Sequence, residues 1–259
     1  MRGQTISDLA KYKGCSTKTM RRIINSWIVT EPEPLRDLSK TKHLVIDGAY
    51  LKSRRESAVV VMDGINSKPV FGKYGAKESY PCLIRLFLDM KSLCCNPISA
   101  SIDGLPAVSR ALRAVWPEII IQRCIVHIQR QGLMWCRAKP KRTDAKKLRK
   151  IFLKITNIKT KEDEQEFKKL VVAWEDRYGY KIENSKETGW VFSDLKRARS
   201  MLLKAICNAF HYIENENIPK TTNSAEGCFS RLKGLIKDHR GIKGKRREYL
   251  FKWFIITRK

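Results

Sequence analysis

The spacing of apolar residues predicts two short helices at the start of the chain. In residues 5–27, apolar side chains recur at helical intervals on both sides of a break at Gly14. Ser16 or Thr17 is suited to cap the second helix. Two helices joined by a turn that contains glycine form a helix-turn-helix, although a plain helical hairpin would show the same pattern.

After a polar linker at residues 31–42, which contains two prolines, the periodicity changes to that of strands. Three strand candidates, residues 44–51, 57–63 and 69–74, are joined by short connections, which predicts an antiparallel meander. Helical and strand-like segments then alternate in the order helix 79–94, strand 98–102, helix 105–116 and strand 119–124. This alternation predicts an α/β fold in which a mixed sheet carries helices on its faces.

Beyond His127 the strand pattern stops, and lysine, glutamate, leucine and tryptophan recur at helical spacing. The pattern therefore predicts an all-helical insertion. The resulting division of the chain is a helix-turn-helix at 1–30, the linker at 31–42, the first part of the α/β core at 43–127, the insertion at 128–218, and the second part of the core with a basic tail at 219–259.

The net charge indicates the class of partner. The chain has 53 Lys and Arg residues against 26 Asp and Glu residues, and its formal net charge of +27 exceeds what solubility requires. Nucleic acid fits this charge better than a membrane surface does, because no segment approaches the roughly 18 consecutive apolar residues of a spanning helix. The first ten residues contain no apolar run of the kind found in signal peptides. We expect a soluble intracellular protein that binds nucleic acid.

Basic residues gather in the second predicted helix and towards the end of the chain. From Cys228 to Lys259 there are eleven Lys and Arg residues against two acids. Such side chains are suited to contact DNA phosphates. The expected DNA-binding residues are Lys18, Arg21, Arg22, Arg231, Lys233, Arg240, Lys243, Lys245, Arg246 and Arg247.

Three Asp-Gly pairs are the first candidates for chemistry. Each could be an ordinary turn, since turns favour both residue types, and Asp63 is assigned to a hairpin turn because its flanking strands are close in sequence. Asp47 and Asp103 differ, because each ends an apolar strand that we place in the centre of the sheet. If those two strands are neighbours, both carboxylates emerge together, and like charges packed together are costly unless a cation lies between them.

A divalent metal held by carboxylates is suited to phosphodiester chemistry. Two ions about 4 Å apart can activate the attacking oxygen and stabilise the leaving oxygen, and hard oxygen ligands select Mg²⁺ or Mn²⁺. The basic surface would then hold DNA against the metals. Asp47 and Asp103 are therefore predicted metal ligands.

A third acid is expected from a helix after the insertion. Glu226 lies in the first turns of a predicted helix that Thr222, Asn223 or Ser224 would cap, although an ordinary acid is also favourable near the positive end of a helix. Three other acids compete for the role. Glu214 and Glu216 precede Pro219 and are expected to face solvent, and Asp238 lies about three helical turns further along, too far to share one metal centre.

The eight cysteines are scattered, and no two have the Cys-x-x-Cys spacing of a zinc or redox site. We therefore expect thiols in a reducing compartment. The exception is Cys124 with His127, because a cysteine and a histidine three residues apart could share a metal. Two such residues cannot complete a tetrahedral zinc site, so we favour a packing or DNA-positioning role beside the predicted metal ligands over metal ligation.

The order of these features resembles a known family. The strand ending in Asp47-Gly48, the segment ASIDG with Asp103, the motif QRCIVHIQR with Cys124 and His127, and the segment TTNSAEG with Glu226 are together similar to transposases of bacterial insertion sequences related to Mutator elements. The resemblance covers nearly the whole chain. It implies an RNase H-like catalytic core with an Asp-Asp-Glu triad, interrupted by a helical insertion between the second Asp and the Glu.

The resemblance also implies an activity. Asp47, Asp103 and Glu226 would be the catalytic metal ligands, holding two Mg²⁺ or Mn²⁺ ions for hydrolysis at transposon ends, and the freed 3′-hydroxyl would attack target DNA. The implied partners are double-stranded DNA and a second copy of the chain, because pairing two ends requires two active sites. The implied location is the bacterial cytoplasm, at the nucleoid. Two alternatives remain open: a DNA-binding protein without activity, and a structure-specific nuclease with the same core.

Overall fold

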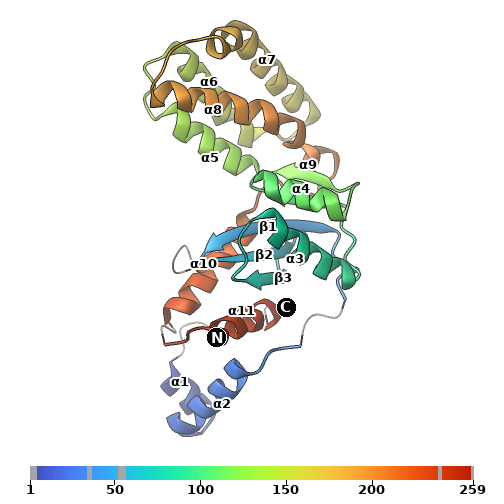
Figure 1. Cartoon of the computed structure of the whole chain (residues 1–259), viewed down its shortest axis with the longest axis vertical. Helices are drawn as coiled ribbons and strands as arrows, with labels where there is room; N and C mark the ends of the chain where they lie inside the picture. Colours follow the sequence, from blue (N-terminus) through green and yellow to red (C-terminus); the bar gives the residue numbers. More distant parts are fainter. Residues whose placement is uncertain (1–4, 34–36, 52–56, 239–240, 258–259) are drawn as a thin grey trace. The chain divides into compact units, whose positions relative to one another are not determined.

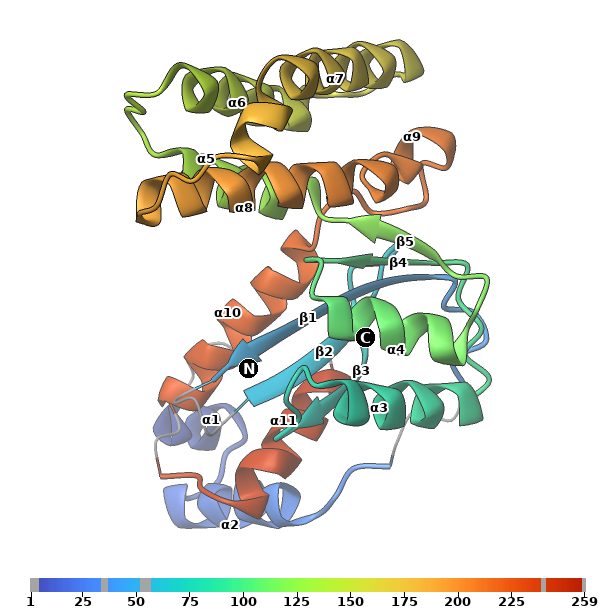
Figure 2. The ribbon, with the colours of Figure 1, turned by 45° about the horizontal axis from the view of Figure 1, so that its top comes forward.

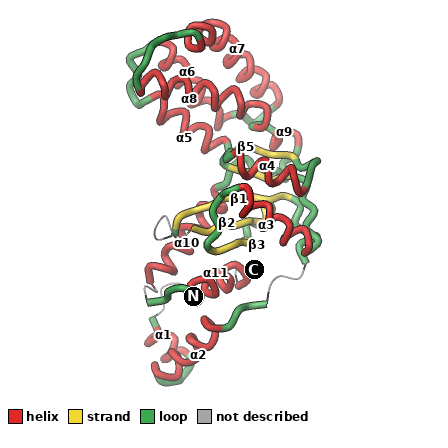
Figure 3. Tube along the Cα trace, viewed as in Figure 1, coloured by secondary structure: helices red, strands yellow, loops and turns green. Residues whose placement is uncertain are grey.

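The computed structural model describes residues 5–33, 37–51, 57–238 and 241–257. Its strands form one five-stranded mixed sheet in the order β3-β2-β1-β4-β5. Figure 1 labels β1, β2 and β3, and Figure 3 draws the strands in yellow. The strands are β1 His43–Tyr50, β2 Ser57–Asp63, β3 Pro69–Tyr74, β4 Ser99–Ile102 and β5 Ile120–Arg123. The α/β class and the mixed sheet expected from the alternating pattern are therefore confirmed.

Two kinds of pairing build the sheet. β2 and β3 are antiparallel, with Val59 opposite Lys73, whereas β1 and β4 are parallel, with Leu44 opposite Ala100, and β4 and β5 are also parallel. The valine-rich strand β2 is fully buried from Ala58 to Met62, as expected of a strand covered on both faces. The first and fourth strands are neighbours, which is the condition under which Asp47 and Asp103 were expected to emerge together.

The chain divides into two compact units, and the first comprises residues 1–42, 46–96 and 223–259. Besides most of β1, all of β2 and all of β3, its described helices are α1 Ile6–Tyr12, α2 Thr17–Val29, α3 Tyr80–Ser92, α10 Asn223–Asp238 and α11 Lys245–Thr257. The Ser16 side chain caps α2 by accepting a hydrogen bond from the Thr19 backbone nitrogen at 3.0 Å. Gly14, with φ of +62°, supplies the left-handed residue in the turn between α1 and α2.

Within this unit, α10 contacts β2 and α11 contacts β3. The Phe251 side chain of α11 is 1% exposed, and a Cβ atom on Gly72 of β3 would lie 2.8 Å from its ring. Trp253 joins the same helix to α2. Its ring packs edge to face against the Trp27 ring, with 4.8 Å between the ring centroids, and its Nε1 donates a hydrogen bond to the Trp27 carbonyl oxygen at 2.9 Å. The C-terminal helix thus connects the first helices to the sheet.

The second unit comprises residues 43–45 and 97–222. Besides β4 and β5, its helices are α4 Pro106–Val115, α5 Ile125–Cys136, α6 Thr143–Lys154, α7 Lys161–Glu183, α8 Trp190–Ala205 and α9 His211–Glu214, with short 3₁₀ turns η1 Ile155–Asn157 and η2 Ile206–Asn208. Figure 2 shows α5 and α8 lying side by side, and the two helices are in contact. The insertion is helical as predicted, but α5 begins at Ile125, so His127 lies inside its first helix.

The insertion has its own hydrophobic core. Phe152, Trp174, Leu195 and Leu202 are among its buried side chains. The Trp174 indole nitrogen donates a hydrogen bond to the Asp144 carbonyl oxygen at 3.0 Å, so this buried nitrogen has a hydrogen-bond partner inside the core. Among the residues the structure describes, no helix combines the length and apolar character needed to cross a membrane.

The first prediction concerns the contact between β3 and α11. Gly72→Ala would place a methyl group 2.8 Å from the Phe251 ring and 2.9 Å from the Val59 carbonyl oxygen. The carbonyl belongs to the backbone of β2, so its displacement would be energetically costly. We expect the free energy of unfolding to fall by about 1–3 kcal/mol, measured by urea denaturation. Gly234→Ala in α10 is the control. No atom lies within 4 Å of its added methyl, so it should be neutral or stabilise the helix. Equal stability of the two variants would contradict this packing.

Candidate functional site

The parallel pairing of β1 and β4 aligns two of the predicted acids. Val45 lies opposite Ser101 in the register, so Asp47 and Asp103, each two residues further on, stand at the same level. The residues of β1 are buried from His43 to Ile46, and exposure begins at Asp47. β1 continues to Tyr50, so Asp47 lies inside its strand rather than at its end as the sequence pattern suggested.

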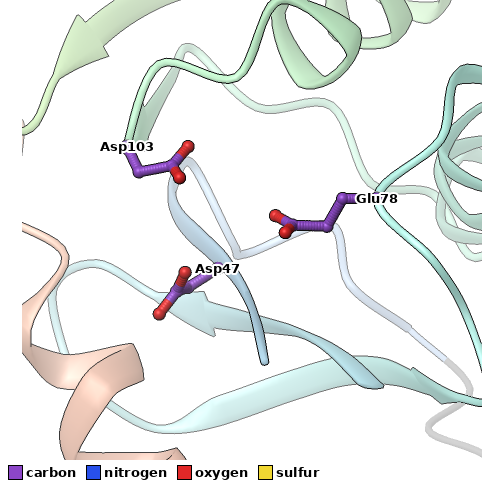
Figure 4. A group of neighbouring side chains, drawn as sticks. All are labelled: Asp47, Glu78 and Asp103. Carbon is purple, nitrogen blue, oxygen red and sulfur yellow. The ribbon is translucent and has the colours of Figure 1, made fainter. Parts of the chain in front are cut away.

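A third acid that the sequence did not single out lies beside them. Asp47, Glu78 and Asp103 each offer a carboxylate oxygen, and these oxygens all lie within 4.8 Å of one another. Figure 4 shows the Glu78 and Asp103 side chains extending towards each other, with Asp47 on β1 next to them. Glu78 comes from the connection between β3 and α3. We call these three residues the acidic cluster.

The glycine after Asp47 makes room for Glu78. A Cβ atom on Gly48 would lie 2.4 Å from the Glu78 Cδ and 2.8 Å from its Oε1. Any larger residue would therefore displace the carboxylate from its place beside Asp47. A glycine inside a strand marks a close approach of another group, and this was the signal in the sequence that could have pointed to a missing partner of Asp47.

The glycine after Asp103 has a similar role. Gly104 has φ of +101°, and a Cβ atom there would lie 1.8 Å from the guanidinium carbon of Arg123. Arg123 Nη2 donates to the Asp103 carbonyl oxygen at 3.3 Å, while the Leu105 backbone nitrogen donates to the Asp103 carboxylate at 3.0 Å. Burial lowers the pKa of the Arg123 guanidinium, and the nearby Asp103 opposes that change. Arg123 thus fixes the loop that carries Asp103.

Asp63 differs from the other two Asp-Gly residues, as predicted. Its Oδ1 accepts hydrogen bonds from the backbone nitrogens of Ile65 at 2.8 Å and Asn66 at 3.3 Å. This is the pattern of a turn stabilised by an aspartate side chain. The carboxylate therefore closes the hairpin between β2 and β3, and the turn assignment is confirmed.

Glu226 lies in the first turn of α10 and is half-buried. It is not a member of the acidic cluster, and its role as a ligand remains a prediction. Its competitors lie elsewhere: Glu214 and Glu216 are both exposed, as expected, and Glu214 pairs with the Lys161 ammonium at 2.7 Å. Asp238 is the last residue of α10.

Cys124 and His127 meet a residue from the far end of the insertion. The Thr222 backbone nitrogen donates to Cys124 Sγ at 3.3 Å, and Thr222 Oγ1 lies 3.2 Å from His127 Nδ1. Burial raises the pKa of the Cys124 thiol, but hydrogen bonds from His127 and Thr222 outweigh that effect, so its pKa lies below the usual value. Within the described residues, Cys124 and His127 belong to no group of three potential metal ligands. The eight cysteines all lie within the described residues, and none of them forms a disulfide.

Of the expected DNA-binding residues that the structure describes, all but one are exposed. Exposed positions are Lys18, Arg21, Arg22, Arg231, Lys233, Lys243, Lys245 and Arg246. Arg240 lies outside the described residues. The expectation for Arg247 was wrong: it is 2% exposed, and its Nε and Nη2 donate to the Ile242 carbonyl at 3.1 and 2.6 Å. Its guanidinium supports the start of α11 and is not available to a phosphate.

Comparison with known proteins agrees with the geometry. A family model described as "Transposase, Mutator family" matches residues 17–198, which is more than half of the chain and includes the whole acidic cluster. The chain is also 26% identical over 141 residues to the transposase for insertion sequence element ISRM3 of Rhizobium meliloti (strain 1021). That alignment covers 52% of this chain and 35% of the relative, so the matched region spans about a third of that protein's length. This chain belongs to the Mutator family of transposases.

Proposed function

We propose that this chain carries the catalytic centre of a metal-dependent transposase, which cleaves DNA strands at transposon ends and transfers them into target DNA. The observation that supports the proposal most strongly is the acidic cluster in a chain of the Mutator family. Asp47 and Asp103 come from adjacent, parallel strands, and Glu78 comes from the connection between β3 and α3. We further propose that the α/β core is RNase H-like and that α1 and α2 form a DNA-binding helix-turn-helix.

The residues present fit a hard divalent cation. Carboxylate oxygens are the ligands that Mg²⁺ and Mn²⁺ prefer, and the cluster offers three of them within 4.8 Å. The space that Gly48 leaves for Glu78 would be filled by any side chain at that position. We propose Asp47, Asp103 and Glu226 as ligands, with Glu78 as an additional carboxylate of the same centre. When bound, two such ions would activate the attacking oxygen and stabilise the leaving oxygen of an in-line displacement.

The chain's own residues have separate tasks in this proposal. Asp47 lies in β1 and Asp103 directly follows β4, so the hydrogen-bonded pairing of these strands restrains both residues, and Arg123 restrains the Asp103 loop. The exposed basic residues of α2 and α10 would bind the phosphates of double-stranded DNA. Because two transposon ends must be paired, we propose that two copies act together on DNA.

The second prediction concerns the ligands. Asp47→Asn, Asp103→Asn and Glu226→Gln keep the side-chain shape but remove a negative charge that would bind the metal. We expect each to lower Mg²⁺-dependent cleavage of end-containing DNA by about 10²-fold or more, since a metal contributes several kcal/mol to such a reaction. DNA binding should be retained. The measurements are nicking and strand-joining assays on labelled DNA, with binding followed by gel shift.

The matched control for these variants is Asp63→Asn, because Asp63 belongs to the same type of Asp-Gly pair but closes a turn. It should leave cleavage within about tenfold. If a folded Asp47→Asn protein still cleaves while Asp63→Asn does not, the proposed centre is wrong. Cleavage without joining would indicate a nuclease, and DNA binding without either activity would indicate a binding protein.

The third prediction concerns Glu78. Glu78→Gln removes its charge, and Gly48→Ala would push its carboxylate away by placing a methyl 2.4 Å from Cδ. We expect both variants to weaken Mn²⁺ binding by about tenfold or more, measured by titration calorimetry without DNA. Gly241→Ala, whose added methyl meets no atom within 4 Å, should bind Mn²⁺ as the unchanged chain does. Unaltered affinity in both test variants would exclude Glu78 from the centre.

The fourth prediction concerns the basic surface. DNA affinity should fall steeply with salt, with a log-log slope of about −0.9 for each phosphate contact. Lys18→Ala and Arg246→Ala should each reduce that slope by about one contact, measured by fluorescence anisotropy at several salt concentrations. Lys146→Ala, which removes an exposed charge from α6, is the charge-matched control. A salt-independent affinity would contradict the electrostatic contribution.

A further inference from the structure

The two ends of the helical insertion are joined by side chains that are far apart in the sequence. Cys124 is the residue between β5 and α5, and Thr222 is the last residue before α10. Both are 0% exposed. The contacts described above connect Thr222 to Cys124 and to His127 of α5. We call Cys124, His127 and Thr222 the Cys–His–Thr cluster.

Neighbouring hydrogen bonds strengthen the same junction. The Ile125 backbone nitrogen donates to the Lys220 carbonyl at 3.1 Å, and the Ser101 hydroxyl of β4 donates to the Pro219 carbonyl. On the strand side, the Cys124 backbone nitrogen donates to the Ile102 carbonyl at 2.8 Å. Residues 219–222 are thus attached to the ends of β4 and β5 and to the start of α5.

This attachment lies next to the last predicted ligand. Glu226 is four residues beyond Thr222, which is about one turn, or roughly 6 Å, along a helix. Between Asp103 and Glu226 the chain passes through the whole insertion before it returns to the sheet at α10, which contacts β2. The buried hydrogen bonds at the point of return add a second restraint, because they fix the chain directly before the first turn of α10, where Glu226 lies.

The residue types suit a positioning role rather than metal binding. A cysteine and a histidine supply only two ligands, and a zinc site needs four. Here Sγ accepts from a backbone nitrogen, and the histidine Nδ1 shares a hydrogen bond with the threonine hydroxyl, whichever of the two donates. Buried polar groups that are satisfied in this way favour one arrangement of the chain, because any other leaves them without partners.

We propose that Cys124, His127 and Thr222 are positioning residues that fix the start of α10 and thereby place Glu226 for metal binding. The inference rests on the proposed function, because it assigns Glu226 to the metal centre. The Cys-x-x-His motif acts through Thr222 and does not itself touch the metal.

The test is a double-mutant cycle that pairs Thr222→Val with Glu226→Gln, with Mn²⁺ affinity and DNA cleavage as the two measurements. Thr222→Val keeps the backbone nitrogen and the side-chain shape but removes the hydroxyl that meets His127. In the otherwise unchanged chain we expect Thr222→Val to weaken Mn²⁺ binding by about tenfold, as loss of a supporting residue does elsewhere. When Glu226 is already glutamine, the same substitution should change the affinity by less than about twofold.

Two further variants separate positioning from general stability. Thr222→Ser retains the hydroxyl and should restore affinity and cleavage to near the original values. Phe152→Leu loosens the core of the insertion without altering the Cys–His–Thr cluster. Its effect on Mn²⁺ affinity should be the same in the original chain and in the Glu226→Gln variant. If Thr222→Val does not fold, His127→Ala removes the same hydrogen bond from the other side, and its half-buried site tolerates the change better.

The outcomes distinguish this inference from the proposed function. Equal effects of Thr222→Val in the two backgrounds, or none in the original chain, would overturn the positioning role. If Asp47→Asn in the same assays leaves both Mn²⁺ binding and cleavage intact, the metal centre itself is wrong, and the positioning role is overturned with it. If Asp47→Asn abolishes Mn²⁺ binding and cleavage, while the effects of Thr222→Val and Glu226→Gln on Mn²⁺ affinity simply add, only the positioning role is overturned.

Discussion

The parallel pairing of β1 with β4 is the interaction on which the candidate site depends. Parallel strands end at the same edge of a sheet, so a register with Val45 opposite Ser101 brings the next acid of each strand to one level. A shift of one residue would turn each side chain to the other face of the sheet and separate the two carboxylates. A hydrogen bond between His43 Nδ1 and Ser99 Oγ, 2.9 Å apart, joins two residues that are opposite each other in this register and so opposes such a shift.

The sheet could be predicted from the sequence because its signals are local. Alternating apolar segments located all five strands within one or two residues, and the close spacing of β2 and β3 identified their antiparallel hairpin. The register of β1 against β4 was not accessible in this way, because the pairing joins residues more than fifty positions apart. The sequence placed both strands in the centre of the sheet but left their adjacency as a condition, and the structure meets that condition.

Glu78 and Arg247 show why side-chain roles are harder to predict than elements. Glu78 lies in a polar connection, where an acid is usually a solvated residue, and its position beside Asp47 depends on how the chain folds back after β3. Arg247 looked like one more charge in a basic segment, yet it caps its own loop from a buried position. Two neighbouring arginines thus have different roles: Arg246 is a surface charge, and Arg247 makes a structural hydrogen bond. The difference arises because they lie on different faces of the same helix, one exposed and one buried.

The excess of positive charge and the acidic cluster have complementary consequences for DNA. A basic surface attracts phosphates wherever they lie along the duplex, so it contributes affinity without selecting the bond to be cut. A phosphate that approaches Asp47 and Asp103 meets negative charge instead, and it is repelled unless a divalent cation lies between. In the proposed mechanism, DNA can therefore bind to the protein without metal, but the scissile phosphate can reach the carboxylates only when the cation is present. This separation of binding from chemistry follows from the opposite signs of the two surfaces.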